Sequence, residues 1–150
     1  MLWLRMKKDS TSSPETPVSP PRLPPELPAR CFDRPGIAGA FLFGSAARGS
    51  RSPLSDLDFA YLGTDAGVEE RVFDAVYESL QRELGEGGFD LVPLRRASLH
   101  LQYQIATDGE LILCREATAL ERFSARAICR YLDFKPYRDA YFSRTASQGG

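Results

Sequence analysis

Hydrophobic and polar positions along the chain predict strands interleaved with helices from about residue 36 onward. Short apolar runs bounded by Gly, Pro or Asp are typical of buried strands. Four such runs occupy 37–43, 57–62, 89–94 and 110–114. Pro93 lies in the third run and donates no backbone hydrogen bond, so this strand is expected at a sheet edge or to end there.

A second pattern, in which apolar residues recur every four positions, predicts helices. A stripe of Val and Leu over 68–84 predicts an amphipathic helix with its cap at Thr64 or Asp65 and its end at Gly85. Further helices are expected over 98–106, 117–132 and 136–144. Together these elements predict an α/β or α+β domain in which helices flank a small mixed sheet.

The first 30 residues follow neither pattern. Seven of the 11 prolines fall between Pro14 and Pro28, in a segment that is also rich in Ser. Such a segment buries too little apolar surface to offset the entropy of ordering. The sequence therefore predicts a disordered Pro/Ser-rich leader over 1–30 and a single domain over 31–150, with the role of the leader open.

Composition narrows the possible partners and compartments. The net charge of −1 argues against broad electrostatic attraction to nucleic acid or to an anionic membrane. No apolar stretch approaches the roughly 20 residues of a membrane span. Three widely spaced cysteines and one histidine supply neither a zinc cluster nor a disulfide framework. Reduced thiols in the cytoplasm are the expectation.

The first candidate for chemistry is Gly44-Ser45, directly after the first predicted strand. Glycine lets a backbone bend sharply or approach a ligand, and Ser45 offers an N–H and a hydroxyl to a phosphate. A Gly-Ser pair after a strand is also common in ordinary turns. The spacing from Gly44 to Gly49 matches a P-loop, but Ser50 stands where that motif needs Lys, which excludes it.

Three aspartates are the second candidate. Asp56 and Asp58 are two residues apart on a predicted strand, which places both carboxylates on one face. Asp90 lies inside another predicted strand. If the two strands are neighbours, the three carboxylates converge and suit two Mg²⁺ ions. Taken singly, an Asp-x-Asp pair is more often a solvated strand face, and Asp90 is as consistent with an edge-strand residue that faces water.

In combination, these residues form the pattern Gly-Ser-x10-Asp-x-Asp from Gly44 to Asp58. This pattern resembles the signature of the nucleotidyltransferase superfamily with the DNA polymerase β-like fold. Within it, the chain is most similar to minimal nucleotidyltransferases of the MntA antitoxin type, which accompany HEPN-domain toxins. The resemblance covers about residues 36–145 and leaves out the leader.

The resemblance implies roles for these residues. Gly44 and Ser45 would hold the β- and γ-phosphates of ATP, and Arg48 would steady the loop or a phosphate. Pairing of Arg48 with an aspartate is an equal alternative.

For the acidic residues, the resemblance implies that Asp56 and Asp58 ligate two Mg²⁺ ions. Asp90 would ligate the catalytic ion and help to deprotonate the acceptor. The implied reaction transfers AMP from ATP to a tyrosine of the partner HEPN ribonuclease toxin, in a hetero-oligomer. Transfer to a small molecule such as an aminoglycoside, or neutralisation by binding alone, are the alternatives.

Two weaker signals remain. Arg122, Arg126 and Arg130 recur every four residues and predict either a solvated basic face or a contact with an acidic partner or a nucleotide. Arg95 and His100 have the spacing of the ribonuclease motif of HEPN toxins. Because HEPN domains are all-helical and this stretch lies between two predicted strands, an ordinary helix residue is the expected role of His100.

Overall fold

The fold is a four-stranded sheet between two layers of helices. The computed structural model describes residues 3, 23–44, 57–85 and 87–148, with the backbone alone for 141–148. In chain order the elements are α2 (Leu27–Phe32), β1 (Ile37–Phe43), β2 (Leu57–Gly63), α3 (Ala66–Leu84), β3 (Phe89–Pro93), the 3-10 turn η1 (Leu94–Arg96), α4 (Leu99–Asp108), β4 (Glu110–Cys114) and α5 (Ala117–Gln148).

The sheet is mixed and has the strand order β3-β2-β1-β4. β1 pairs antiparallel with both β2 and β4, whereas β2 pairs parallel with β3. All four strands form at the predicted places, and the predicted fold class is confirmed. β3 lies at an edge and Pro93 is its last residue, which satisfies both expectations for this proline.

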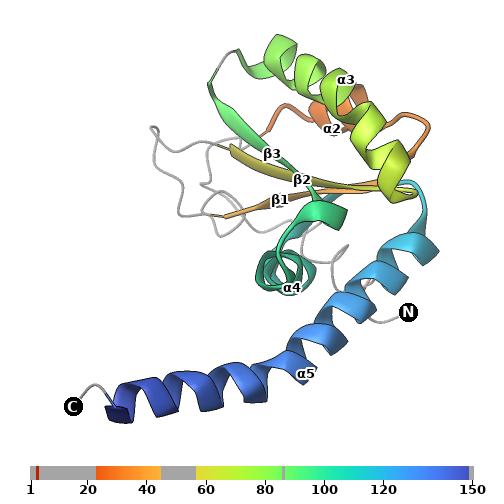
Figure 1. Cartoon of the computed structure of the whole chain (residues 1–150). Coiled ribbons are helices and arrows are strands. Elements are labelled where there is room, and N and C mark those ends of the chain that lie inside the picture. Colours follow the sequence, from red (N-terminus) through yellow and green to blue (C-terminus); the bar gives the residue numbers. More distant parts are fainter. Residues whose placement is uncertain (1–2, 4–22, 45–56, 86, 149–150) are drawn as a thin grey trace, which may run out of the picture.

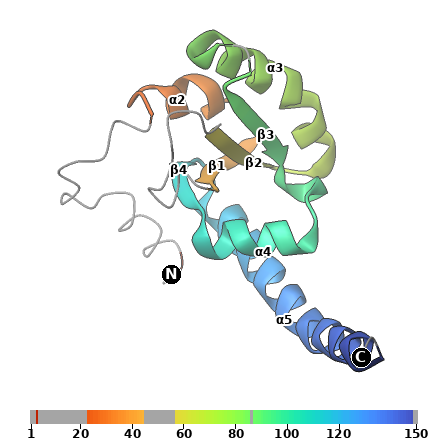
Figure 2. The same cartoon turned by 90° about the vertical axis from the view of Figure 1, so that its left-hand side faces the viewer.

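Alternation along the strands sends side chains into two separate cores. Leu57, Phe59 and Tyr61 of β2 pack with α2 and α3 on one face of the sheet. Ala60 and Leu62 point the other way and pack with residues of α4 and α5. Figures 1 and 2 show the same layering, with α2 and α3 on one side of the sheet and α4 and α5 on the other.

Helix α3 has the predicted stripe and ends. Asp65 is the cap: its side chain accepts a 2.8 Å hydrogen bond from the Val68 N–H. Gly85 follows the last helical residue with φ +83°, a conformation that glycine adopts without strain. Val76 and Leu80 are fully buried, and burial of such side chains contributes about 1.5–3 kcal/mol each.

Helix α2 begins at Leu27, four residues before the predicted start of the domain at residue 31, and packs on the sheet. Leu27, Cys31 and Phe32 of α2 are completely buried against the sheet. Burial raises the pKa of the Cys31 thiol to about 11. α2 was missed since it is only six residues long and follows a Pro-rich run, although proline is well suited to a first helical turn.

Trp3 lies within the predicted leader but packs against the domain. Its ring packs near Phe41, with ring centroids 6.3 Å apart. Its indole N–H donates a 2.7 Å hydrogen bond to the Ala106 carbonyl. A half-buried position suits tryptophan, because its large apolar ring can pack against other side chains while its N–H donates a hydrogen bond. The prediction for residues 4–22 lies outside the described residues.

The two predicted C-terminal helices are one. α5 runs from Ala117 to Gln148 with Pro136 inside it. The fixed φ of proline is compatible with a helix. Proline destabilises a helix because it removes one backbone hydrogen bond and because its ring clashes with the carbonyl four residues back, and a bend in the helix relieves that clash. Figure 1 shows α5 changing direction in its outer part, away from the body of the domain. Among the described residues, no helix is long and apolar enough to cross a membrane.

Candidate active site

The end of β1 forms a tight backbone approach to β2. Phe43 is the register partner of Asp58, and Gly44 follows with φ +75°. A Cβ at Gly44 would overlap the Asp58 carboxylate. The position therefore requires glycine for two reasons, the positive φ and the space that Asp58 occupies. The other predicted residues of this bend, Ser45 and Arg48, and the neighbouring Asp56 lie outside the described residues.

The parallel pairing of β2 and β3 brings the two described aspartates side by side. Asp58 is the register partner of Asp90. Because paired residues of neighbouring strands point to the same face and the strands lie about 4.8 Å apart, the two carboxylates belong to one cluster. Asp58 is half-buried and Asp90 is exposed. Leu57 and Phe89 point to the opposite face and enter the core, as predicted for strand residues of this kind.

This cluster suits a divalent cation. Two like charges on adjacent strands repel, and a cation with hard oxygen ligands relieves that repulsion. Among the described residues, no group of three His, Cys, Asp or Glu is placed to hold a metal, and the proposed third ligand, Asp56, lies outside them. The fit rests on Asp58 and Asp90 as neighbours and on the close approach of the Gly44 backbone to the Asp58 carboxylate, which only a glycine allows.

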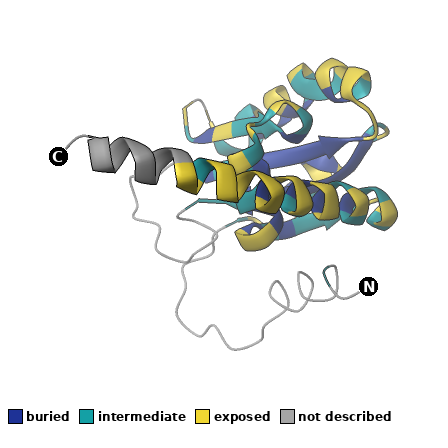
Figure 3. Ribbon diagram, turned by 60° about the horizontal axis from the view of Figure 1, so that its bottom comes forward, coloured by how far each residue is buried: buried dark blue, intermediate teal, exposed yellow. Residues whose placement is uncertain are grey.

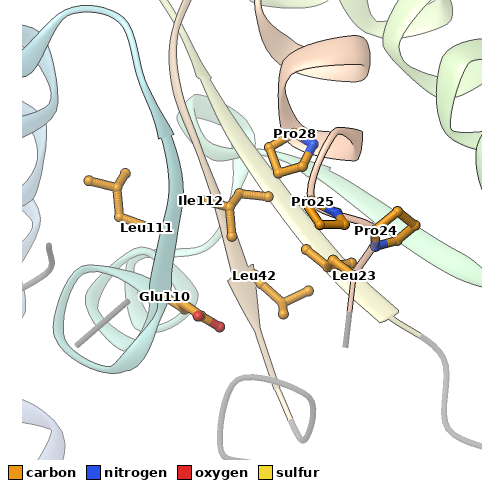
Figure 4. Close-up of a pocket in the computed structure, with 8 residues that line it drawn as sticks. All are labelled: Leu23, Pro24, Pro25, Pro28, Leu42, Glu110, Leu111 and Ile112. Atoms are coloured by element: carbon orange, nitrogen blue, oxygen red, sulfur yellow. The ribbon is translucent and has the colours of Figure 1, made fainter. Parts of the chain in front are cut away.

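Two hollows lie next to Gly44 and the end of β1. The smaller, of about 160 Å³, lies between Gly44 and α4 and is lined by Phe43, Leu101, Gln104 and Asp108 among others. The larger, of about 400 Å³, lies between Leu42, β4 and the start of α2 (Figure 4). Its walls are apolar except for Glu110, which the sequence analysis did not single out. One hollow thus borders Gly44 itself, and the other borders Leu42 near the end of β1.

Comparison with known proteins agrees with this arrangement. The polymerase β nucleotidyltransferase family model matches residues 29–118, more than half of the chain. The chain belongs to this family. It is therefore a nucleotidyltransferase, as its Gly-Ser and Asp-x-Asp pattern predicts. A search of curated protein sequences gave no match.

Solved structures of toxin–antitoxin complexes contain similar chains. One, a toxin–antitoxin crystal structure with AMP-PNP, matches with 25% identity and a TM-score of 0.65 over 83% of this chain and 99% of the other. A variant of the MntA–HepT toxin–antitoxin matches with 27% identity and a TM-score of 0.59 over 75% and 87%. The complex of a tri-AMPylated Shewanella oneidensis HEPN toxin with MNT antitoxin matches with 24% identity and a TM-score of 0.52 over 76% and 87%.

At the other end of β2, the nucleotidyltransferase holds a buried carboxylate that the sequence analysis missed. Glu69 is 1% exposed. It accepts hydrogen bonds from the backbone N–H groups of Gly63, at 2.8 Å, and Arg95, at 2.9 Å. Burial raises the pKa of Glu69, and these two hydrogen bonds oppose the rise. Tyr61 donates its hydroxyl to the Glu69 carbonyl at 2.6 Å, and burial raises its pKa.

Glu69 joins the first turn of α3, the end of β2 and η1, and it has a structural role. A signal for it is present in the sequence. Glu69 falls on the apolar stripe of α3, three residues before Val72 and seven before Val76. A charged residue on the buried side of a helix requires internal partners.

The residues of the apparent ribonuclease motif have other roles. Arg95 donates to the Gly63 carbonyl at 3.0 Å and to the Thr64 carbonyl at 3.2 Å. His100 is exposed on α4, with its ring 5.7 Å from that of Tyr131. The mixed sheet also differs from an all-helical HEPN domain, so the ordinary role expected for His100 agrees with the structure.

The arginine stripe of α5 is exposed, as predicted. Arg122, Arg126 and Arg130 are all exposed, whereas Leu120, Ala127 and Tyr131 on the opposite side of the helix are buried. Figure 3 shows these two sides of α5, exposed in yellow and buried in blue. Tyr131 stacks on Tyr103 of α4 with ring centroids 4.1 Å apart. This contact fixes the direction in which the arginines point.

Proposed function

We propose that this nucleotidyltransferase transfers AMP from ATP to a tyrosine of a HEPN-type ribonuclease toxin in the cytoplasm and thereby acts as its antitoxin. The observation that carries the proposal is the pairing of Asp58 with Asp90 beside Gly44. A glycine bend next to convergent carboxylates is what nucleotidyl transfer requires, since the protein's main task is to position phosphates and balance their charge.

Each residue of the site has a proposed task. The backbone at Gly44 and Ser45 binds the β- and γ-phosphates, and Arg48 steadies them. Asp56, Asp58 and Asp90 hold two Mg²⁺ ions. When bound, these ions supply charge neutralisation and lower the pKa of the acceptor hydroxyl.

The chain's own residues then place the reacting groups. The tyrosine hydroxyl oxygen forms a bond to the α-phosphorus of ATP, and the bond between that phosphorus and the β-phosphate oxygen breaks. Pyrophosphate leaves with the bonding electrons, held at Gly44 and Ser45. The proton of the hydroxyl passes to the carboxylate of Asp90, which is exposed and therefore open to an incoming acceptor.

The similar structures support the choice of nucleotide and acceptor. One holds AMP-PNP, an ATP analogue, in a toxin–antitoxin complex. Another holds a HEPN toxin that carries three AMP groups, together with an MNT antitoxin. We propose the same donor and the same class of acceptor for this chain, with the toxin encoded by a neighbouring gene.

Intact-mass spectrometry of the co-expressed toxin tests the proposal. The wild-type chain with ATP and Mg²⁺ is expected to add one or more AMP masses to the toxin, and the Asp58→Asn, Asp90→Asn double variant to add none. Asp74→Asn on exposed α3 is the matched control and is expected to transfer normally. Equal labelling by the double variant would reject these residues as the site. An unlabelled but inactive toxin would show neutralisation by binding alone. If the wild-type chain adds no AMP to the toxin but adds it to an aminoglycoside, the acceptor is a small molecule and the proposal of a protein acceptor is rejected.

A further inference from the structure

A groove of about 530 Å³ lies at the end of β2 that is remote from Asp58. Arg95, Arg122 and Arg126 line it together with Thr64, and Phe123 provides an apolar wall. Thr64 follows Asp58 by six residues along an extended strand, which is roughly 20 Å at 3.3 Å per residue. The groove is therefore separate from the candidate active site.

In the part of the chain that the structure describes, no ion pair involves an arginine of the groove. Among the described residues, the ion pairs are Arg30–Glu83, Arg96–Glu70, Arg115–Asp33 and Arg138–Asp139. None of them involves a groove arginine. The side chain of Arg95 is held by the neutral carbonyls of Gly63 and Thr64. Three arginines thus border one hollow, and the carboxylate of Glu69, which is hydrogen-bonded to the Arg95 N–H, is already committed to two backbone N–H groups.

This arrangement is preorganised for an anionic ligand. Arg95 is held by its two hydrogen bonds, and the packing of α5 on the sheet and α4 places Arg122 and Arg126 on the side of the helix that borders the groove. Guanidinium groups bind carboxylates through paired hydrogen bonds, and an ordered guanidinium loses less entropy on binding. The ligand class is therefore one that carries several carboxylates or phosphates in a row.

The surface that continues from the groove favours a protein as the ligand. Farther along the exposed side of α5, Arg130 is followed by Phe134, 50% exposed, and Tyr137, 77% exposed. Arg, Tyr and Phe are the residues enriched at protein interfaces. The net charge of −1 does not favour nucleic acid, which proteins bind through an excess of positive charge.

We propose that the groove of Arg95, Arg122 and Arg126 docks an acidic segment of the partner toxin. The identity of the partner rests on the proposed function, whereas the groove and its charge do not. Docking about 20 Å from the carboxylates, by the strand rise given above, raises the effective concentration of the acceptor tyrosine at the active site. The groove arginines then act on the apparent affinity for the toxin and leave the chemical step unchanged.

Charge reversal on α5 tests this docking. Arg122→Glu, Arg126→Glu is compared with Arg71→Glu, Arg82→Glu, which changes the net charge equally on exposed positions of α3, on the other face of the sheet. Calorimetry with the HEPN toxin is expected to show at least about tenfold weaker binding for the α5 variant and less than about a twofold change for the α3 control. AMP-PNP binding is expected to be equal in all three proteins.

Kinetics and salt provide the second readout. In AMP transfer, the α5 variant is expected to raise the KM for the toxin at least about tenfold with kcat unchanged. Toxin binding by the wild type is expected to weaken with rising salt, and the α5 variant to lose most of that dependence. The milder Arg126→Gln is expected to give the same effects at smaller size, which guards against misfolding of the double variant.

Three outcomes would overturn the docking proposal. Toxin binding by the α5 variant at wild-type affinity would remove the groove from the interface. Binding of oligouridylate by the wild type, lost in the α5 variant, would assign the groove to nucleic acid. Loss of AMP-PNP binding would assign it to the nucleotide. If none of the three compared proteins transfers AMP but only the α5 variant fails to bind the toxin, the proposed AMP transfer is rejected and the docking proposal is supported.

Discussion

The two ends of strand β2 hold carboxylates in opposite ways. At its start, Asp58 is half-buried beside the exposed Asp90, and the two like charges point to one face of the sheet. At its end, Glu69 is 1% exposed and accepts from two backbone N–H groups. The same chemical group is thus left open to a cation at one end and enclosed at the other.

The difference shows that burial and internal partners decide what a carboxylate does. The carboxylate of Glu69 is hydrogen-bonded within the fold, so this residue joins three elements and contributes stability. Asp58 and Asp90 are brought side by side by strand pairing, and their like charges favour a bound cation. Four substitutions or measurements separate the two roles.

Asp90→Asn is expected to have the largest effect, on activity alone. AMP transfer should fall by about a thousandfold, or about 4 kcal/mol in the barrier. The melting temperature should stay the same or rise slightly, because one of two repelling charges is removed. Transfer assays and thermal unfolding measure the two quantities, with Asp74→Asn as control. A destabilised but active variant would place Asp90 with Glu69 as a structural carboxylate.

Glu69→Ala is expected to have the opposite effect, which is to lower stability and leave AMP transfer by the folded protein intact. It leaves the N–H groups of Gly63 and Arg95 without their acceptor, and at about 1–3 kcal/mol each the unfolding free energy should fall by about 2–6 kcal/mol. Urea unfolding measures it. Glu70→Ala is the control, since Glu70 is exposed and has only a surface ion pair with Arg96, worth less than about 1 kcal/mol. Equal losses in the two variants would contradict the distinction.

Gly44→Ala tests whether the backbone beside Asp58, at the start of β2, is needed for activity. A positive φ costs a non-glycine residue about 1–2 kcal/mol, and the new methyl group would also displace the Asp58 carboxylate. Gly87→Ala separates these effects, because Gly87 has φ +77° but open space around its Cβ position. Both variants are expected to lose similar stability, and only Gly44→Ala to lose AMP transfer. Normal transfer by Gly44→Ala would argue against a close approach at this bend.

The pH dependence of stability tests the role of Glu69 at the end of β2, and it is the smallest of the four expected effects. Folding raises the pKa of Glu69, so its protonated form is favoured in the folded state. The stability it contributes is full below the ordinary glutamate pKa and is lost as pH rises through the folded pKa. From pH about 4 to neutral, the unfolding free energy of the wild type should therefore fall relative to that of Glu69→Gln. A constant difference would show that the hydrogen bonds cancel the effect of burial.

Most of the fold could be predicted because its elements have strong local signals. The four strands are short apolar runs with breakers at both sides, and α3 has a full apolar stripe with Asp65 and Gly85 at its ends. α2 could not be predicted in this way, since six residues give less than two turns of periodicity. The continuity of α5 through Pro136 could not be predicted either, because a proline in a helical pattern usually ends or kinks the helix.

The candidate site was predictable in its residues but not in its geometry. Gly44, Asp58 and Asp90 could be named from the sequence, whereas the pairing of Asp58 with Asp90 depends on which strands become neighbours. Strand order is a long-range property, and β3 follows β2 in sequence only after the whole of α3. The groove at Arg95 joins three separate segments, so only half of it, the stripe on α5, had a sequence signal.

Pro136 divides α5 into two parts that differ in how they are anchored. The inner part is tied to the sheet and to α4 through Leu120, Ala127 and Tyr131. Beyond it, the missing N–H of Pro136 leaves the Leu132 carbonyl without its helical donor, and the side chains from Leu132 to Ala140 are mostly exposed. Amide hydrogen exchange is therefore governed by local fraying in the outer turns and by global opening in the inner ones. A fluorophore or affinity tag attached beyond the proline would report on this end of the helix without disturbing the core.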